Sequence, residues 1–316
     1  MRAVASAGDP GESAGTEQPW AVFRAALVDE GVLLATDVDG VYGRSATYES
    51  VVEAFERVIL RVGADQEAVS LRFPPVMPWS TFVKTGYLES FPDQMGSVQT
   101  FGGDDRLHAE LVHRAGTGED RGSLLETVDV ALCPAVCHPV YPTQSGRLPE
   151  GGRRVEVYGY CFRHEPSADP FRMQSFRQHD YVYLGTPEGA LAHHDQWIDR
   201  GLEVFGALGL EAESVVGTDP FFGRSGRMLA ANQRSQKLKH ELVVPVFATG
   251  RPTAIASSNS HLDHFSRPFG IDTATGDPAH TACFGFGVDR IALALLDRHG
   301  LDPNQWPAGV RSILWP

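Results

Sequence analysis

The sequence predicts an α+β fold: an antiparallel sheet flanked by helices. Strand-like and helix-like segments follow one another irregularly, without the regular strand–helix alternation of a parallel α/β protein. Residues 154–184 have the pattern of a long hairpin, and residues 47–64, 187–208 and 287–299 carry apolar side chains at helical spacing. The chain contains no internal repeat, which excludes solenoid and propeller folds.

The first segments of the chain set the domain boundary. Residues 1–19 are rich in Gly, Ala, Ser, Pro and Glu and lack the apolar core of a signal peptide, so they are predicted to be a disordered lead-in. Residues 20–316 are predicted to form one domain. Within it, residues 71–83 are predicted to be a strand or loop broken by prolines, and residues 129–140 a short strand that ends in a turn at Pro139.

The second half of the chain contains the hairpin and the clearest helix. The outgoing strand, residues 154–163, includes the run VEVYGYCF, and the returning strand spans residues 173–184. After the helix at residues 187–208, two short strands are predicted at residues 242–247 and 252–257. These segments supply most of the sheet and one of the helices that cover it.

Composition and charge argue against several classes of protein. The chain has 316 residues, with 40 acidic against 27 basic side chains and a formal net charge of −13. A protein that grips nucleic acid normally presents Lys and Arg to the phosphates, so this balance argues against a nucleic-acid partner. No apolar run reaches the roughly 18 residues that a membrane span needs, and a cytoplasmic location follows as the default.

Two short motifs carry the most specific signal. The first is CFRHE at residues 161–165, followed by RMQSFR at residues 172–177; the second is GFGVDR at residues 285–290, where the last helix starts. Each alone is compatible with an ordinary surface strand or helix start. Together, and in this order, they resemble motifs 2 and 3 of the class II aminoacyl-tRNA synthetases. The segment around Pro75 and Pro78 is a looser match to motif 1, the dimer element.

This resemblance implies that the chain binds ATP and joins its α-phosphorus to an amino-acid carboxylate, with pyrophosphate as the leaving group. Negative charge develops on the phosphoryl oxygens, so fixed guanidinium groups are the side chains that the reaction needs. Arg163 would hold the α-phosphate and the carboxylate, and Arg290 would contact the γ-phosphate. Arg172 and Arg177 are further candidates for the phosphate tail.

Other residues would hold adenine and the metal ion that accompanies ATP. Glu165 lies two residues beyond Arg163 on the same strand and would accept from the adenine amino group. Phe176, on the returning strand, would stack on the adenine ring. Magnesium is expected with ATP. The strand at residues 253–256 carries no acid where seryl enzymes place a magnesium-binding Glu, which leaves Glu241 as the substitute ligand.

A closer resemblance covers most of residues 70–300. The matching segments are KTGYLESFP (84–92), CHPVYP (137–142), RHEPS (163–167), SFR (175–177) and HTAC (280–283). They resemble the bacterial amino acid:[carrier protein] ligases, which are similar to the catalytic domain of the atypical seryl-tRNA synthetases of methanogens and lack a tRNA-binding domain. The resemblance implies activation of glycine or alanine as the adenylate and transfer to the phosphopantetheine thiol of a carrier protein. A homodimer is expected, and the acidic charge agrees with the absence of tRNA as a partner.

The same resemblance implies a zinc ion that binds the substrate amino group through an open coordination position. Its ligands would be Cys137, Asp180 and Cys283, a donor set suited to a catalytic zinc site. The family has Glu where this chain has Asp180, so the carboxylate here is one methylene shorter. From the residues alone, all four cysteines are also compatible with buried apolar positions, and Cys133 and Cys161 are assigned to the core.

Three further residues are predicted to contact the substrate. Asn259 and His261 belong to the segment SSNSHLDHF (257–265), which lines the amino-acid pocket in the family, and Lys239 resembles a family position near the active site. The alternatives are a polar loop with capping side chains and a solvated Lys. No histidine has the context of a catalytic triad, and adenylation needs no general base because the attacking carboxylate is already ionised.

Two other functions stay open. A truncated synthetase would charge tRNA and present a basic docking face, against which the net charge of −13 argues. A non-catalytic synthetase paralogue would bind an amino acid and regulate a partner. Loss of Arg163 or Arg290 would indicate that paralogue; both are present, whereas the missing acid at Ala254 keeps it open. The sequence therefore favours an ATP-dependent, AMP-forming amino acid:[carrier protein] ligase.

Overall fold

A computed structural model describes residues 18–247 and 249–316 of the chain. Most of the predicted lead-in, residues 1–17, lies outside the described residues. Helix α1 (Pro19–Asp29) begins at Pro19, the last residue of the predicted lead-in at residues 1–19. Proline suits a helix start because the first N–H groups of a helix have no helical partner. None of the helices in the described part of the chain is long and apolar enough to cross a membrane.

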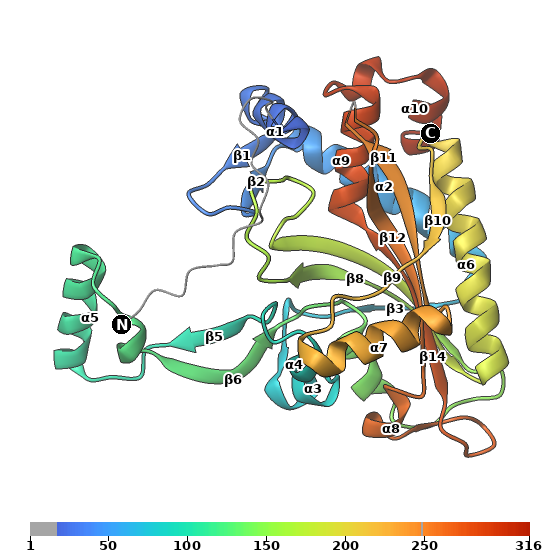
Figure 1. Cartoon of the computed structure of the whole chain (residues 1–316), viewed down its shortest axis with the longest axis horizontal. Helices are drawn as coiled ribbons and strands as arrows, with labels where there is room; N and C mark the ends of the chain where they lie inside the picture. The colour runs from blue at the N-terminus through green and yellow to red at the C-terminus, as the bar shows by residue number, and fades with distance from the viewer. Residues whose placement is uncertain (1–17, 248) are drawn as a thin grey trace.

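The centre of the fold is a seven-stranded sheet (Figure 1). Its strand order is β10 (Glu213–Val216), β11 (Lys239–Val246), β12 (Arg251–Leu262), β14 (His280–Gly287), β9 (Ser175–Gly185), β8 (Arg153–Phe162) and β3 (Val69–Arg72). All neighbouring strands are antiparallel except β3 and β8, which are parallel. The predicted hairpin is confirmed as β8 and β9, with Cys161 directly opposite Phe176.

Three helices cover one face of this sheet. They are α2 (Ala46–Val62), α6 (Pro187–Ala207) and α9 (Val288–His299), the three that apolar spacing predicts. Their apolar side chains and the sheet form the largest core, in which Trp197 of α6 stacks on Tyr181 of β9 with ring centres 4.2 Å apart. Ser45 and Thr186 cap α2 and α6, because each side chain accepts from a backbone N–H of the first turn.

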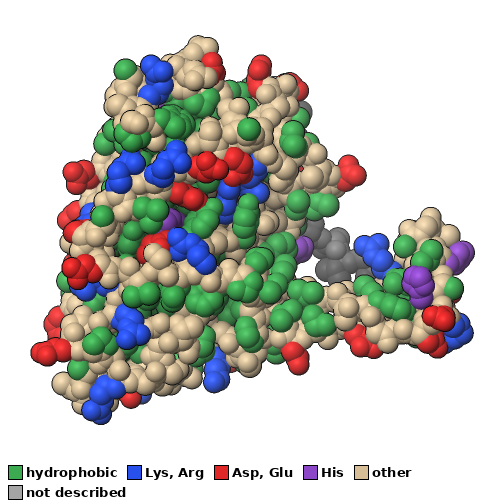
Figure 2. All heavy atoms as spheres, turned by 180° about the vertical axis from the view of Figure 1, so that it is seen from behind, with side chains coloured by type: hydrophobic (Ala, Val, Ile, Leu, Met, Phe, Trp, Pro, Cys, Tyr) green, Lys and Arg blue, Asp and Glu red, His purple; other side chains and the backbone are tan. Residues whose placement is uncertain are grey.

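A smaller three-stranded sheet forms an arm that projects from the main body (Figures 1 and 2). Its strands, in order, are β4 (Val76–Pro78), β6 (Glu126–Leu132) and β5 (Ser97–Thr100). Helices α3 (Trp79–Lys84) and α4 (Tyr87–Ser90) lie at its base, and α5 (Asp105–Thr117) lies at its tip. No residue of α5 is buried, so this helix has little packing of its own against the main body.

The remaining elements lie between these units or follow α9. The helical ones are η1 (Ala64–Gln66), η2 (Gly122–Leu124), η3 (His138–Gln144), α7 (Gly223–Ser235), α8 (Ser266–Phe269), η4 (Pro303–Gln305) and α10 (Ala308–Leu314). The extended ones form two small pairs: β1 (Leu33–Ala35) with β2 (Tyr42–Arg44), and β7 (Gly146–Arg147) with β13 (Ile271–Asp272). Of these, η3 and α8 contribute to a second core on the face of the sheet opposite α6.

The structure corrects the bounds of three predicted segments. Residues 79–83, predicted as part of a broken strand or loop, lie in helix α3, because Pro78 stands at the N-cap and starts the helix. The strands predicted at residues 242–247 and 252–257 are longer, since β11 begins at Lys239 and β12 continues to Leu262. The added residues are mostly polar, so the apolar pattern ends before the strands do.

A buried ion-pair network joins the hairpin to the last helix. Asp289, in the first turn of α9, accepts from the backbone N–H of Arg177 at 2.6 Å and pairs with its guanidinium at 2.8 Å. Arg177 also pairs with Glu49 of α2, and Arg44 of β2 pairs with Asp289 at 3.1 Å. Burial raises the pKa of Asp289, but the two guanidinium groups outweigh it and hold that pKa below its usual range. The network fixes the start of α9, where Arg290 follows, against β9.

Replacing the central carboxylate tests how much this network stabilises the fold. Asp289→Asn leaves the buried Arg177 without its main charge partner, so the free energy of unfolding is expected to fall by about 3–5 kcal/mol. Denaturant titration measures this change. Asp263→Asn is the matched control, because Asp263 pairs with Arg267 on the surface, where the expected loss is below about 1 kcal/mol. Equal losses in the two variants would contradict a special role for Asp289.

Candidate active site

Side-chain alternation gathers the predicted site residues on the sheet face opposite α6. Successive residues of a strand point to opposite faces, and residues paired in register share a face. Lys239 pairs with Asn259, Asn259 pairs with Cys283, and Gly285 pairs with Asp180. Residues spaced by two along these strands therefore bring together Lys239, Glu241, Asn259, Cys283, Asp180 and Phe176, and His261 joins them at an irregularity of β12.

The two arginines of the motifs are held at the same site by backbone carbonyls. Arg163, just beyond β8, donates from Nε to the Pro134 carbonyl at 3.0 Å, and its guanidinium carbon lies 5.5 Å from the Phe176 ring centre. Arg290 donates from a terminal nitrogen to the Ala254 carbonyl at 3.1 Å. Burial, together with the positive charge of Arg163, lowers the pKa of Arg290. Because the charge of Arg163 acts on Arg290, the two guanidinium groups together create a field that favours an anionic ligand.

The remaining predicted ATP residues lie around Arg290. Glu165 and Glu241 raise the pKa of Arg290, whereas Arg172 lowers it, so all three contribute to the field at that guanidinium. Glu241 also accepts from the Lys239 ammonium, with Oε1 and Nζ 3.2 Å apart. The carboxylates therefore balance part of the positive charge at the site.

Arg177 does not join this group. It follows Phe176 on β9, so its side chain points through the sheet to the face covered by helices. There it is 3% exposed, and its guanidinium bonds Glu49 and Asp289. The prediction that Arg177 contacts the phosphate tail is therefore corrected: two adjacent strand residues cannot both face the same ligand.

The three predicted zinc ligands lie together. Cys137, Asp180 and Cys283 are buried, and their ligand atoms all lie within 4.8 Å of one another. Cys137 stands at the start of η3, Asp180 is on β9 and Cys283 is on β14. Thiolate and carboxylate donors at this separation suit a four-coordinate zinc ion with one open position. Among the described residues, this is the only such group of three potential metal ligands.

The environment of the Asp180 carboxyl suits a metal ligand. Its Oδ1 is buried without a hydrogen-bond partner, which is costly for an oxygen in this setting. Burial raises the pKa of Asp180 to about 7, although the Cys137 thiol and the charge of Arg163 lower it. A divalent cation would reverse this shift by stabilising the carboxylate. Gly285 leaves the space that Asp180 occupies, since a Cβ at that position would lie 2.7 Å from Oδ1.

Cys133 and Cys161 are buried outside the metal-type group, as predicted. Cys133 donates to the Ala135 carbonyl at 3.1 Å, and Cys161 donates to the Gln178 side chain at 3.0 Å. Burial raises the pKa of both thiols. Both cysteines therefore remain protonated, as core residues do.

Sequence reasoning missed three residues of the site. Tyr141 is fully buried, and its ring stacks on Phe265 with ring centres 4.1 Å apart. His138 is buried with an unpartnered Nδ1, and burial lowers its pKa to about 3. Asp219, in the loop before α7, pairs with Lys239. Tyr141 and His138 belong to the CHPVYP segment, in which only Cys137 had been given a role.

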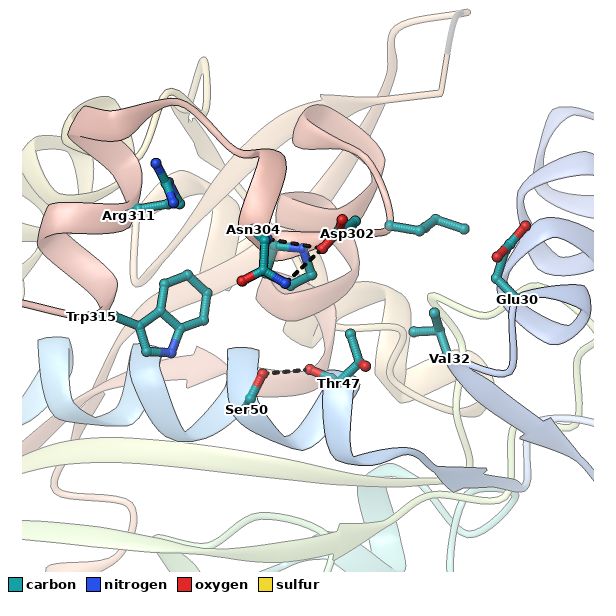
Figure 3. A pocket seen from close by; sticks show the side chains of 10 residues that line it. Glu30, Val32, Thr47, Ser50, Asp302, Asn304, Arg311 and Trp315 are labelled. Carbon is teal, nitrogen blue, oxygen red and sulfur yellow. Dashed lines mark hydrogen bonds between the residues drawn. The ribbon is translucent and has the colours of Figure 1, made fainter.

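A hollow in the described surface lies elsewhere (Figure 3). It has a volume of about 560 Å³ and is lined by residues of α2, η4 and α10, among others. Ser50 donates to the Thr47 carbonyl there, and Asp302 accepts from Asn304. None of the predicted site residues lines this hollow, so the motif chemistry belongs to the sheet face and not to the hollow.

The fold is similar to known class II synthetase structures. Methanopyrus kandleri seryl-tRNA synthetase, solved with Aquifex aeolicus tRNASec, matches with a TM-score of 0.78 at 22% identity, covering 92% of this chain and 60% of that one. Pyrococcus horikoshii seryl-tRNA synthetase, solved with ATP, matches with a TM-score of 0.67 at 14% identity, covering 92% and 62%. The chain thus spans less than two thirds of these structures, and it has the class II synthetase catalytic fold.

Curated relatives show the family. Amino acid–[acyl-carrier-protein] ligases 1 and 2 of Bradyrhizobium diazoefficiens are 44% and 42% identical. Each alignment covers 87% of this chain, and 85% and 83% of the respective relative. The type-2 serine–tRNA ligase of Methanopyrus kandleri is 28% identical over 80% of this chain and 51% of its own length. No protein-family model matches the chain. The chain belongs to the amino acid–[acyl-carrier-protein] ligases, a family of enzymes.

Removing single thiols tests whether the group of Cys137, Asp180 and Cys283 binds metal. We expect the purified protein to bind one zinc ion per chain, measured by elemental analysis and chelator competition. Cys137→Ser and Cys283→Ser each remove a ligand and are expected to weaken binding by at least about 100-fold. Cys161→Ser is the matched control, because this thiol is equally buried but not part of the group. Metal binding that survives in the Cys283 variant would contradict the assignment.

Proposed function

We propose that the enzyme activates a small amino acid, of the glycine or alanine type, as its adenylate and transfers it to the phosphopantetheine thiol of a carrier protein. The names of the two relatives at 44% and 42% identity support the carrier-protein acceptor. The observation that carries the proposal is one sheet face with two arginines, Arg163 and Arg290, beside a metal-type group. The arginines suit an adenylation reaction, and the metal-type group suits the substrate amino group.

In the first step, the amino-acid carboxylate attacks the α-phosphorus of ATP, and the bond between that phosphorus and pyrophosphate breaks. Arg163 and Arg290 stabilise the charge on the phosphoryl oxygens from fixed positions, because backbone carbonyls already hold both side chains. Phe176 stacks on adenine, and Glu165 accepts from the adenine amino group. Arg172 contacts the phosphate tail.

The substrate side of the site has two parts. Cys137, Asp180 and Cys283 are proposed to hold zinc, whose open position would bind the free α-amino group and so select for amino acids. The unpartnered Oδ1 of Asp180 supports this, because a metal ion would satisfy it. The other part is formed by Asn259, a predicted substrate contact beside Cys283; His261, the other predicted contact, also lies against this thiol.

Charged residues at the edge of the site are assigned to magnesium and substrate. Magnesium enters with ATP, and Glu241 is its proposed protein ligand. Lys239, which pairs with both Glu241 and Asp219, is proposed to contact the substrate. Only Oε1 of Glu241 contacts Lys239, so its second carboxylate oxygen is available to a cation.

In the second step, the carrier-protein thiolate attacks the carbonyl carbon of the adenylate. A carbon–sulfur bond forms, the bond from the carbonyl carbon to the phosphate oxygen breaks, and AMP leaves with the bonding electrons. The net charge of −13 agrees with a protein acceptor in place of tRNA. A homodimer and a cytoplasmic location remain predictions of the sequence.

A second candidate function is the charging of tRNA. The 28% identity to a type-2 serine–tRNA ligase favours it, and this chain spans about half the length of that relative. The two candidates share the adenylation step and differ in the acceptor. A measurement of the acylated product therefore separates them.

Amino-acid-dependent exchange of pyrophosphate into ATP tests the first step. We expect exchange with glycine or alanine in a panel of amino acids. Arg163→Lys is expected to lower the exchange rate by about 100-fold or more, because a guanidinium fork is lost from the phosphoryl oxygens. Arg154→Lys is the matched control, since Arg154 is an exposed arginine of β8, the strand that ends just before Arg163. No exchange with any amino acid would favour a non-catalytic paralogue.

Intact-mass analysis tests the second step. The enzyme is incubated with ATP, the accepted amino acid and a carrier protein, with or without its phosphopantetheine arm. The mass of one aminoacyl group is expected on the carrier with the arm only, and hydroxylamine is expected to release it as a thioester. Acylated tRNA from the same organism, without acylated carrier, would identify the enzyme as a tRNA ligase.

A further inference from the structure

We propose that His261 acts on the metal centre by donating a hydrogen bond to the Cys283 thiolate, and that Thr281 fixes the ring for this purpose. The inference rests on the proposed zinc site and goes beyond it. The sequence predicts His261 as a substrate contact, whereas the structure gives its ring nitrogens two protein partners. His261 would thus be a positioning residue for a metal ligand.

The distances define a short chain of three side chains. Nε2 of His261 lies 3.6 Å from Sγ of Cys283, and Nδ1 of the same ring lies 3.1 Å from Oγ1 of Thr281. Thr281 is fully buried and Cys283 is 4% exposed, so water does not compete freely for these contacts. Both nitrogens of the ring are therefore engaged within the protein.

The direction of each hydrogen bond follows from the charge of the metal ligand. A cysteine bound to zinc is a thiolate, which has no proton and acts only as an acceptor. Nε2 of His261 must then carry the ring proton and donate it. Nδ1 is left as the acceptor, and the Thr281 hydroxyl donates to it. In this arrangement the Thr281 hydroxyl donates to Nδ1, and Nε2 donates to the Cys283 thiolate.

A local irregularity of the sheet presents His261 to this thiol. The register of β12 against β14 shifts between Ser260 and Leu262, so His261 is an extra residue in β12. Leu262 follows with a φ of 52°, a left-handed conformation that is unfavourable for a leucine. Bulges of this kind re-aim a side chain. The aromatic ring of Phe265, edge-on to His261 with centres 4.9 Å apart, limits its rotation.

Cys283 receives a second donor from the neighbouring strand. Nδ2 of Asn259 lies 3.8 Å from Cys283 Sγ. Partners that hold the outer side of a metal ligand fix its orientation and commonly contribute 10- to 100-fold in metal affinity. The expected contribution of His261 lies in that range.

Four variants of the full-length protein test the proposal by zinc affinity, measured by competition with a chromogenic chelator. His261→Phe keeps a ring but removes both nitrogens, and is expected to weaken zinc binding by about 10- to 100-fold. His261→Gln places an amide N–H near the original Nε2 and is expected to restore most of the affinity. Thr281→Val removes only the hydroxyl and is expected to give a smaller loss. His264→Phe is the matched control, because His264 lies in the same segment as His261 but bonds the Thr85 carbonyl.

The outcomes are distinct. Wild-type affinity in both His261→Phe and Thr281→Val would overturn the proposal, and a raised KM for the amino acid without loss of zinc would return His261 to the role of substrate contact. Thermal unfolding of the metal-free protein shows whether His261→Phe folds. If it does not, the zinc affinities of Thr281→Val and His261→Gln still test the proposal. Wild-type protein that binds no zinc would overturn the zinc centre itself and this proposal with it, whereas exchange of pyrophosphate would then still test the adenylation reaction.

Discussion

The alternation of side chains along β9 is the constraint on which the two halves of the structure depend. Phe176 and Asp180 point to the face where the proposed chemistry lies, and Arg177 and Tyr181 point to the face packed by helices. The same strand therefore supplies the ring proposed to stack on adenine and a metal-type ligand on one side, and an ion pair and an aromatic stack on the other. A shift of one residue in register would exchange these roles and disrupt both faces at once.

Much of the fold was predictable from the sequence, because long periodic segments report their own burial. The hairpin and the three covering helices follow from apolar spacing. Helices α5 and α7 were not predicted: α5 buries no residue, and a helix without a buried face leaves no clear apolar pattern. Strand β12 was predicted too short, because its last residues serve the polar site and not the core.

Residues of the site that belong to a sequence motif could be predicted. Residues whose role depends on their neighbours in the folded chain were harder to predict. Cys137, Asp180 and Cys283 are far apart in sequence, and only the family resemblance brought them together before the structure did. The misplacement of Arg177 was avoidable, since its neighbour Phe176 already occupied the ligand face. Tyr141 lies in the CHPVYP segment, but its position beside Cys137 appears only in the structure, as does the pairing of Asp219 with Lys239.

The backbone contacts that hold Arg163 and Arg290 affect which substitutions around them are tolerated. Arg163 and Arg290 are held by the main-chain carbonyls of Pro134 and Ala254, and every amino acid supplies such a carbonyl. Side chains at positions 134 and 254 are thus free to change while the guanidinium groups keep their places. The cationic part of the site is therefore tolerant of substitution around it, and its metal-type part, built from side chains alone, is not.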